Sequence, residues 1–111
     1  MGELAVGSVV TTFFPFSDYK KGKLRPSVVL ARVDFGDIIL CQITSKPYAT
    51  SSVIKLTESD FENGKLPLVS YVRPDKLFTI EAKAAQRTVG QLKPVMLNRV
   101  LRQVRGLFEV R

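Results

Sequence analysis

The chain has 111 residues, of which 45% are hydrophobic and 24% are charged, and its formal net charge is +7. This length predicts a single domain over residues 1–111, and a composition this basic favours an anionic partner such as nucleic acid. The sequence has no histidine and one cysteine, which argues against metal sites and histidine-based catalysis and excludes a disulfide within the chain.

The N-terminal sequence MGELAVGSVV has no basic segment followed by a long apolar run. Nothing in the chain approaches the roughly 18 consecutive apolar residues of a membrane-spanning helix. We therefore expect a cytoplasmic protein with no membrane partner. Cys41 lies inside the apolar run DIILCQIT, so we expect a buried thiol in a reducing compartment.

The first two thirds of the chain have the residue types of β-strands. Strands are predicted over residues 7–14, 26–33, 38–44, 51–57, 68–72, 76–81 and 87–92. The DFGD turn joins the second and third of these into a hairpin, and Arg73-Pro74-Asp75 separates the fifth from the sixth. Thr57 and Asp60 have capping-box spacing, which predicts one short helical turn closed by Gly64.

A helix is predicted at the C-terminal end of the sequence. Pro94 suits the first turn of a helix over residues 94–105. The apolar face predicted for this helix consists of Leu97, Val100, Leu101, Val104 and Leu107. The opposite, solvated face carries Arg99, Arg102 and Arg105. Short strands with one terminal helix predict a mainly β fold with α (α+β), in which a small antiparallel sheet curls into a partial barrel covered by the helix.

A cationic loop precedes the second predicted strand. The segment SDYKKGKLRP at residues 17–26 contains Asp18, Lys20, Lys21, Lys23 and Arg25. Since Arg25 precedes a proline, its backbone is biased to an extended form, which places a guanidinium at the root of a strand. Such a group can stabilise charge that develops at phosphorus. The alternative is that the cations only keep an exposed hairpin soluble and unpaired, and charge alone favours that alternative.

A second polar group ends the third predicted strand, where the segment QITSKP contains Thr44, Ser45 and Lys46. If the two strands are neighbours, the Thr44 hydroxyl lies on the same side as Arg25. The alternative is that this hydroxyl only caps the turn. Two alternatives also stay open elsewhere. Arg73 either adds a cation or pairs locally with Asp75. The three tyrosines either stack on bases or pack in the sheet. These residues are Tyr19, Tyr48 and Tyr71.

Four segments follow one another in the chain: VVTTFFPFSDYKKGKLRPSVVLA, DIILCQITSKP, DFENGKLPLVSYVRPDKLFTI and RTVGQLKPVMLNRVLRQV. Together they resemble the PemK/MazF family of toxins from type II toxin–antitoxin systems, over about residues 7–108. The resemblance implies an SH3-like barrel of the CcdB/PemK/MazF type with a C-terminal helix, assembled as a homodimer. It also implies a sequence-selective, metal-independent endoribonuclease without a cofactor, which cuts single-stranded RNA unless a cognate acidic antitoxin blocks it.

The resemblance also assigns roles to residues. The essential arginine and threonine of the family fall on Arg25 and Thr44, while Asp18 and Ser45 stand in matching segments. The RNA 2′-hydroxyl would attack the adjacent phosphorus, with Arg25 neutralising the developing charge, Thr44 binding a non-bridging oxygen and Asp18 as a candidate base. The residues expected to track the RNA backbone are Lys20, Lys21, Lys23, Lys46 and Arg73.

Two other functions fit the same fold. A toxin of this type can inhibit a protein target such as DNA gyrase, as CcdB-type toxins do, and would then not need Arg25. A member could also bind nucleic acid without cutting it. The presence of both Arg25 and Thr44 favours the ribonuclease.

Overall fold

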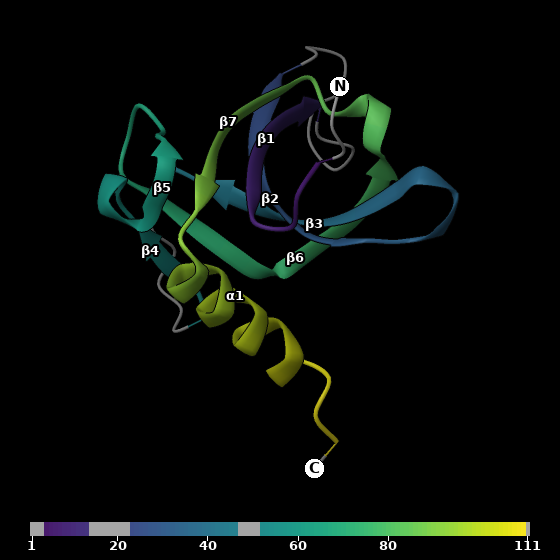
Figure 1. Ribbon diagram of the computed structural model, residues 1–111. Helices are drawn as coiled ribbons and strands as arrows, with labels where there is room; N and C mark the ends of the chain where they lie inside the picture. Colours follow the sequence, from purple (N-terminus) through teal and green to yellow (C-terminus); the bar gives the residue numbers. More distant parts are fainter. Residues whose placement is uncertain (1–3, 14–22, 47–51, 111) are drawn as a thin grey trace.

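The computed structural model of the protein describes residues 4–13, 23–46 and 52–110. In these residues seven strands form one antiparallel sheet, and one helix follows them (Figure 1). The strands are β1 (Ser8–Phe13), β2 (Leu24–Arg32), β3 (Asp37–Thr44), β4 (Ile54–Leu56), β5 (Phe61–Gly64), β6 (Ser70–Glu81) and β7 (Arg87–Leu92), and the helix is α1 (Pro94–Gly106). Their order across the sheet is β4-β6-β3-β2-β1-β7-β5.

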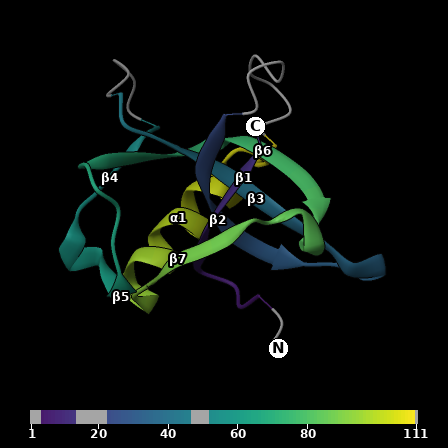
Figure 2. The same cartoon turned by 90° about the horizontal axis from the view of Figure 1, so that it is seen from above.

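The sheet curls (Figure 2). Apolar side chains pack on both of its faces. Successive residues of a strand point to opposite faces. Val9 and Val28 therefore join an inner cluster with Cys41 and Ile43, whereas their neighbours Val10 and Val29 join a smaller outer cluster with Leu40 and Phe78. Helix α1 covers the inner cluster with Met96 and Val100. The predicted curled antiparallel sheet with a terminal helix is confirmed.

Helix α1 begins at the predicted proline and has most of the predicted apolar face. Val100 is fully buried, and Leu97, Leu101 and Val104 are partly buried. Leu107 was a wrong prediction, because it follows the helix and is 46% exposed. Met96 takes the buried place at the other end of the face. The reason is geometric, since the C-terminal end of the helix extends away from the sheet (Figure 1).

The segment around residues 57–64 differs from the prediction. The capping box holds only a single 3₁₀ turn, Glu58–Asp60, in which the Thr57 N–H donates to the Asp60 carboxylate at 2.8 Å. The chain then enters strand β5, which pairs with β7. Gly64 therefore ends a strand instead of a helical turn. Its left-handed φ of 75° and its close approach to the Val89 carbonyl both require glycine.

The predicted break at Arg73-Pro74-Asp75 is a bulge within a single strand, so the prediction of two strands was wrong. Cys41 of β3 lies opposite Leu77 of β6, and the next residue, Gln42, lies opposite Arg73. One step along β3 thus corresponds to four along β6, and residues 74–76 are the extra ones. The proline, which cannot donate a ladder hydrogen bond, lies within this bulge. That the whole chain forms one domain stays a prediction.

Candidate active site

Arg25 and Thr44 come from neighbouring strands. In the β2–β3 ladder Ser27 lies opposite Gln42. The β2–β3 pairing ends there, and continuing the same antiparallel register by two residues brings Arg25 across from Thr44. Residues that stand opposite one another project from the same face of a sheet. The structure therefore places the two predicted catalytic side chains together on the outer face, at the end of the β2–β3 hairpin away from its turn.

A polar row extends from this pair across five strands. Arg25 lies opposite Thr12 of β1, Thr44 opposite Tyr71 of β6, and Tyr71 opposite Lys55 of β4. We call these five residues the Arg25–Thr44 row. Tyr71 is thus both packed in the sheet, where it is half-buried, and adjacent to Thr44. Lys55 was missed in the sequence because its position in the row depends on the pairing of β4 with β6.

Arg25 is the second residue of β2 and is half-buried. Its Nε atom is buried, and within the described part of the chain it has no hydrogen-bond partner. A guanidinium carries five N–H donors in a rigid fork. Arg25 therefore has donors to offer a ligand, and the adjacent Pro26 fixes its root in the extended strand.

Thr44 is the last residue of β3 and is 8% exposed. Its hydroxyl oxygen accepts the Lys46 N–H at 3.2 Å, so it does cap the turn that follows the strand. A hydroxyl that accepts still has its own proton to donate. Capping and ligand binding are thus compatible in this residue. Ser45 and Lys46 continue from the strand end and are exposed.

Arg25 and Thr44 line a pocket of about 380 Å³ at this end of the sheet. Its charged lining residues are all cations: Lys23, Arg25 and Lys65. Its apolar wall comes from β2, β3, β7 and the segment between β5 and β6, and consists of Leu24, Pro26, Ile43, Leu66, Pro67, Leu68 and Val89. Lys65 was missed because it lies between strands, where no periodic pattern marks it. A pocket lined by cations alone suits a polyanion.

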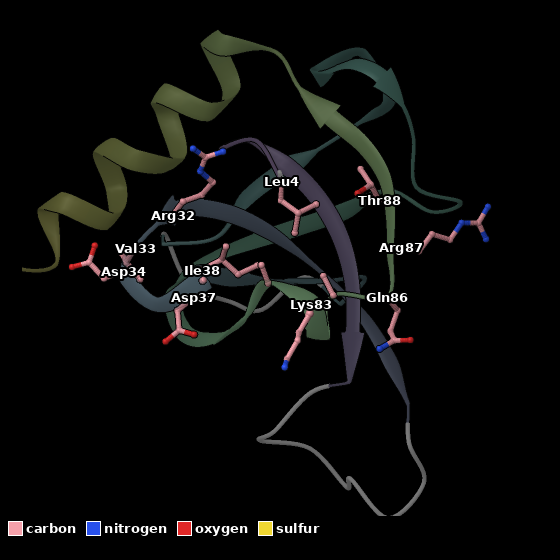
Figure 3. A pocket seen from close by; sticks show the side chains of 13 residues that line it. Leu4, Arg32, Val33, Asp34, Asp37, Ile38, Lys83, Gln86, Arg87 and Thr88 are labelled. Atoms are coloured by element: carbon pink, nitrogen blue, oxygen red, sulfur yellow. The ribbon is translucent and has the colours of Figure 1, made fainter. Parts of the chain in front are cut away.

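A larger pocket, of about 880 Å³, lies at the turn end of the β2–β3 hairpin (Figure 3). Its charged lining is mixed: Arg32, Lys83 and Arg87 stand with Asp34 and Asp37. The Arg87 side chain extends away from the ribbon (Figure 3), and none of the predicted catalytic residues is in the lining. Charge and residue content therefore select the smaller pocket as the candidate active site.

Arg73 lies one position behind the Arg25–Thr44 row, opposite Gln42. Its guanidinium donates to the Asp75 carboxylate, from Nη2 at 3.1 Å and from Nε at 3.4 Å. The local ion pair considered as an alternative is thus present. The cation also stands beside the candidate site. Its predicted role in RNA binding stays a prediction.

Several predicted residues lie outside the described ranges. They are Asp18, Lys20 and Lys21 of the cationic loop, together with Tyr19 and Tyr48. Cys41 is buried as predicted, and burial, with a smaller contribution from the Asp75 charge, raises the pKa of its thiol to about 12. Its thiolate is therefore not a nucleophile near neutral pH. In the described residues no three acidic or cysteine side chains gather as metal ligands, and no helix could span a membrane.

The profile of the PemK-like, MazF-like toxins of type II toxin–antitoxin systems matches residues 5–108. The chain belongs to this family. No curated protein matches the sequence. The family resemblance of the four sequence segments is thus confirmed over nearly the whole chain.

Solved structures of family toxins share the fold. MazE–MazF from Deinococcus radiodurans superposes with a TM-score of 0.75 at 16% identity, covering 100% of both chains. The Mycobacterium tuberculosis toxin MazF-mt6 gives 0.71 at 17% identity, covering 94% of this chain and 98% of that one. A mycobacterial endoribonuclease in complex with its cognate antitoxin gives 0.70 at 15% identity, with coverages of 96% and 93%. At these identities the likeness establishes the MazF-type fold alone.

Proposed function

We propose that this toxin is an endoribonuclease that cuts single-stranded RNA at selected sequences and needs no metal ion. The observation that carries the proposal is that Arg25 and Thr44, from neighbouring strands, line one pocket whose charged lining residues are all cations. The endoribonuclease activity of two structural relatives supports it. Because the sequence has no histidine, proton transfer in the proposed reaction has to use other residues.

The proposed reaction is an in-line displacement at phosphorus. The 2′-oxygen forms a bond to the adjacent phosphorus as the bond from phosphorus to the 5′-oxygen breaks. The 2′-hydroxyl loses its proton and the leaving 5′-oxygen gains one, which gives a 2′,3′-cyclic phosphate and a 5′-hydroxyl. Arg25 stabilises the charge on the non-bridging oxygens, and the Thr44 hydroxyl donates to one of them. Asp18 stays the candidate base, and Ser45 a candidate contact.

We further propose the family's partners for this chain. An acidic antitoxin would bind across the cationic pocket, which the net charge of +7 favours. The toxin itself would be a cytoplasmic homodimer. Sedimentation at micromolar concentration should then give twice the mass of the chain, and a monomer at that concentration would contradict the dimer.

The test is incubation of the purified protein with a long RNA in EDTA, followed by sequencing of the cut ends. We expect discrete cuts at a recurring motif. Arg25→Ala should lower the cleavage rate by about 10² to 10³-fold, as loss of a preorganised donor to a developing oxyanion does. Thr44→Ala should also lower the cleavage rate.

The matched control is Arg99→Ala, which removes an exposed arginine from the polar face of α1. It should cut at the parent rate and at the same sites. Cleavage by Arg25→Ala at the parent rate would contradict the mechanism. A folded parent protein that cuts no RNA would contradict the proposed function itself.

A further inference from the structure

Two buried polar residues lie directly behind the catalytic pair. Ser27 of β2 and Gln42 of β3 stand opposite one another, two residues from Arg25 and Thr44 respectively. Because side chains alternate along a strand, all four project from the same face of the sheet. Ser27 and Gln42 thus extend the sheet face that carries Arg25 and Thr44, outside the set of residues that line the 380 Å³ pocket.

This pair is buried without internal hydrogen bonds. The Oγ of Ser27 and the Oε1 of Gln42 are buried, and neither has a hydrogen-bond partner in the described residues; the same holds for the Nε of Arg25. A buried polar group without a partner is strongly unfavourable, and such groups are rare in native proteins. Three of them on adjacent positions of one sheet face indicate a place prepared for a ligand.

Gln42 as a whole residue keeps the same small exposure as Thr44, whereas its Oε1 atom is buried. Gln42 and Thr44 are each 8% exposed, whereas Ser27 is fully buried. Two residues of a strand span about 7 Å, which is comparable to the span of one nucleotide. A nucleotide whose phosphate contacts Thr44 can therefore bring its base, or that of its neighbour, to Gln42.

The chemistry of the pair distinguishes a base from a phosphate. A phosphate oxygen only accepts hydrogen bonds, so a buried carbonyl oxygen such as Gln42 Oε1 would oppose it. The edge of a nucleobase both donates and accepts, and a carboxamide matches it with one acceptor and two donors. Single-stranded RNA presents these edges freely because its bases are unpaired.

We propose that Gln42, supported by Ser27, binds the edge of the base next to the cleaved phosphodiester and thereby determines part of the cleavage sequence. The assignment rests on the proposed ribonuclease function. The Gln42 Oε1 accepts a hydrogen bond from an exocyclic amine or a ring N–H of this base, and the amide nitrogen donates one to an adjacent acceptor. The Ser27 hydroxyl supplies a further donor and acceptor below the amide.

The test is cleavage of a random-sequence single-stranded RNA pool by the parent protein, Gln42→Leu and Ser27→Ala. We expect the parent to prefer one base at a position adjacent to the cut. Gln42→Leu should reduce this preference about tenfold or more, measured as the ratio of kcat/KM on matched and mismatched RNAs. Ser27→Ala should reduce it at the same position by a smaller factor.

The control Gln103→Leu makes the same substitution on the exposed face of α1 and should preserve the parent motif. If Gln42→Leu does not fold, Gln42→Asn, which keeps the amide but shortens its reach, replaces it and should also lower the preference. A motif unchanged in all these variants, with cleavage still dependent on Arg25, overturns this proposal alone. A parent protein that does not cut, or cuts independently of Arg25, overturns the proposed function and this proposal with it.

Discussion

Single side chains at the candidate site combine a structural and a chemical task. The Thr44 oxygen accepts the Lys46 N–H that turns the chain out of β3, while its proton is left for a ligand. Arg25 enters β2 ahead of a proline that holds its backbone extended. In both residues the constraint that ends or begins the strand also fixes the position of the reactive group. Such preorganisation lowers the entropic cost of reaching the transition state.

Cys41 gives a prediction about pH and stability. Its thiol has a pKa of about 12 in the folded protein, against the ordinary cysteine value of 9.0 that applies in the unfolded chain. Between these values the unfolded chain loses the proton and the folded chain keeps it, so stability falls as pH rises. We expect this group to lower the free energy of unfolding by about 1.4 kcal/mol between pH 8 and pH 10, with no contribution at lower pH.

Denaturant unfolding of the parent and of Cys41→Ala at both pH values isolates the effect. The alanine variant is less stable at pH 8 because it leaves a cavity. The difference in free energy of unfolding between the two proteins should become smaller toward pH 10. A gap of constant size would show that the thiol ionises equally in both states.

Among the elements, β5 depends most directly on one residue. A Cβ on Gly64 would overlap the Val89 carbonyl of β7, and φ at this position is 75°. Gly36, in the β2–β3 turn, has the same φ of 75° but open space around it. Gly36→Ala should therefore lower the free energy of unfolding by about 1 to 2 kcal/mol, which is the cost of placing alanine in the left-handed conformation. Gly64→Ala should cost at least about 2 kcal/mol more, because β5 must separate from β7.

Thermal unfolding of the two variants side by side measures the difference. Equal losses of stability at Gly36 and Gly64 would mean that β5 shifts at little cost. The 380 Å³ pocket gives a second readout, since Lys65 and Leu66 in its lining directly follow β5. We expect Gly64→Ala, and not Gly36→Ala, to weaken RNA cleavage.

The elements also differ in how far the sequence could predict them. The β2–β3 hairpin is predicted by two apolar runs joined by the DFGD turn. Helix α1 is predicted by its helical periodicity and by Pro94 at its start. Strand β5 has the sequence FENG, in which only Phe61 is apolar, so its existence depends on pairing with β7. Part of the candidate site likewise depends on how the strands pair. Arg25 and Thr44 were found through the family motifs, whereas Ser27, Lys55 and Gln42 entered only through cross-strand register.

For the whole molecule, the excess of 17 basic over 10 acidic residues predicts an RNA affinity that depends on salt. Each phosphate contact should contribute about −0.7 to the slope of log affinity against log salt. In a Thr44→Ala background, in which RNA cleavage is slowed, Lys46→Ala should make this slope shallower by about 0.7. Lys93→Ala, at the start of α1, should not change it.

Fluorescence anisotropy with a short single-stranded RNA between 50 and 200 mM NaCl, roughly the range in which such effects are large, gives the slopes. Equal slopes for Lys46→Ala and the Thr44→Ala background would remove Lys46 from the RNA path. An affinity independent of salt would argue that the net charge serves another purpose.

The bulge at residues 74–76 has a consequence for how the protein can vary. Arg73 and Leu77 are four residues apart, which in a regular strand would put them on one face. The extra residues reverse this relation, so that Arg73 stands beside Gln42 while Leu77 packs on the inner cluster. Each half of β6 thus keeps its own register with β3. The length of the chain between the two halves can change without moving either register. This bulge lies next to the candidate site, and it is where the fold can accept insertions and deletions.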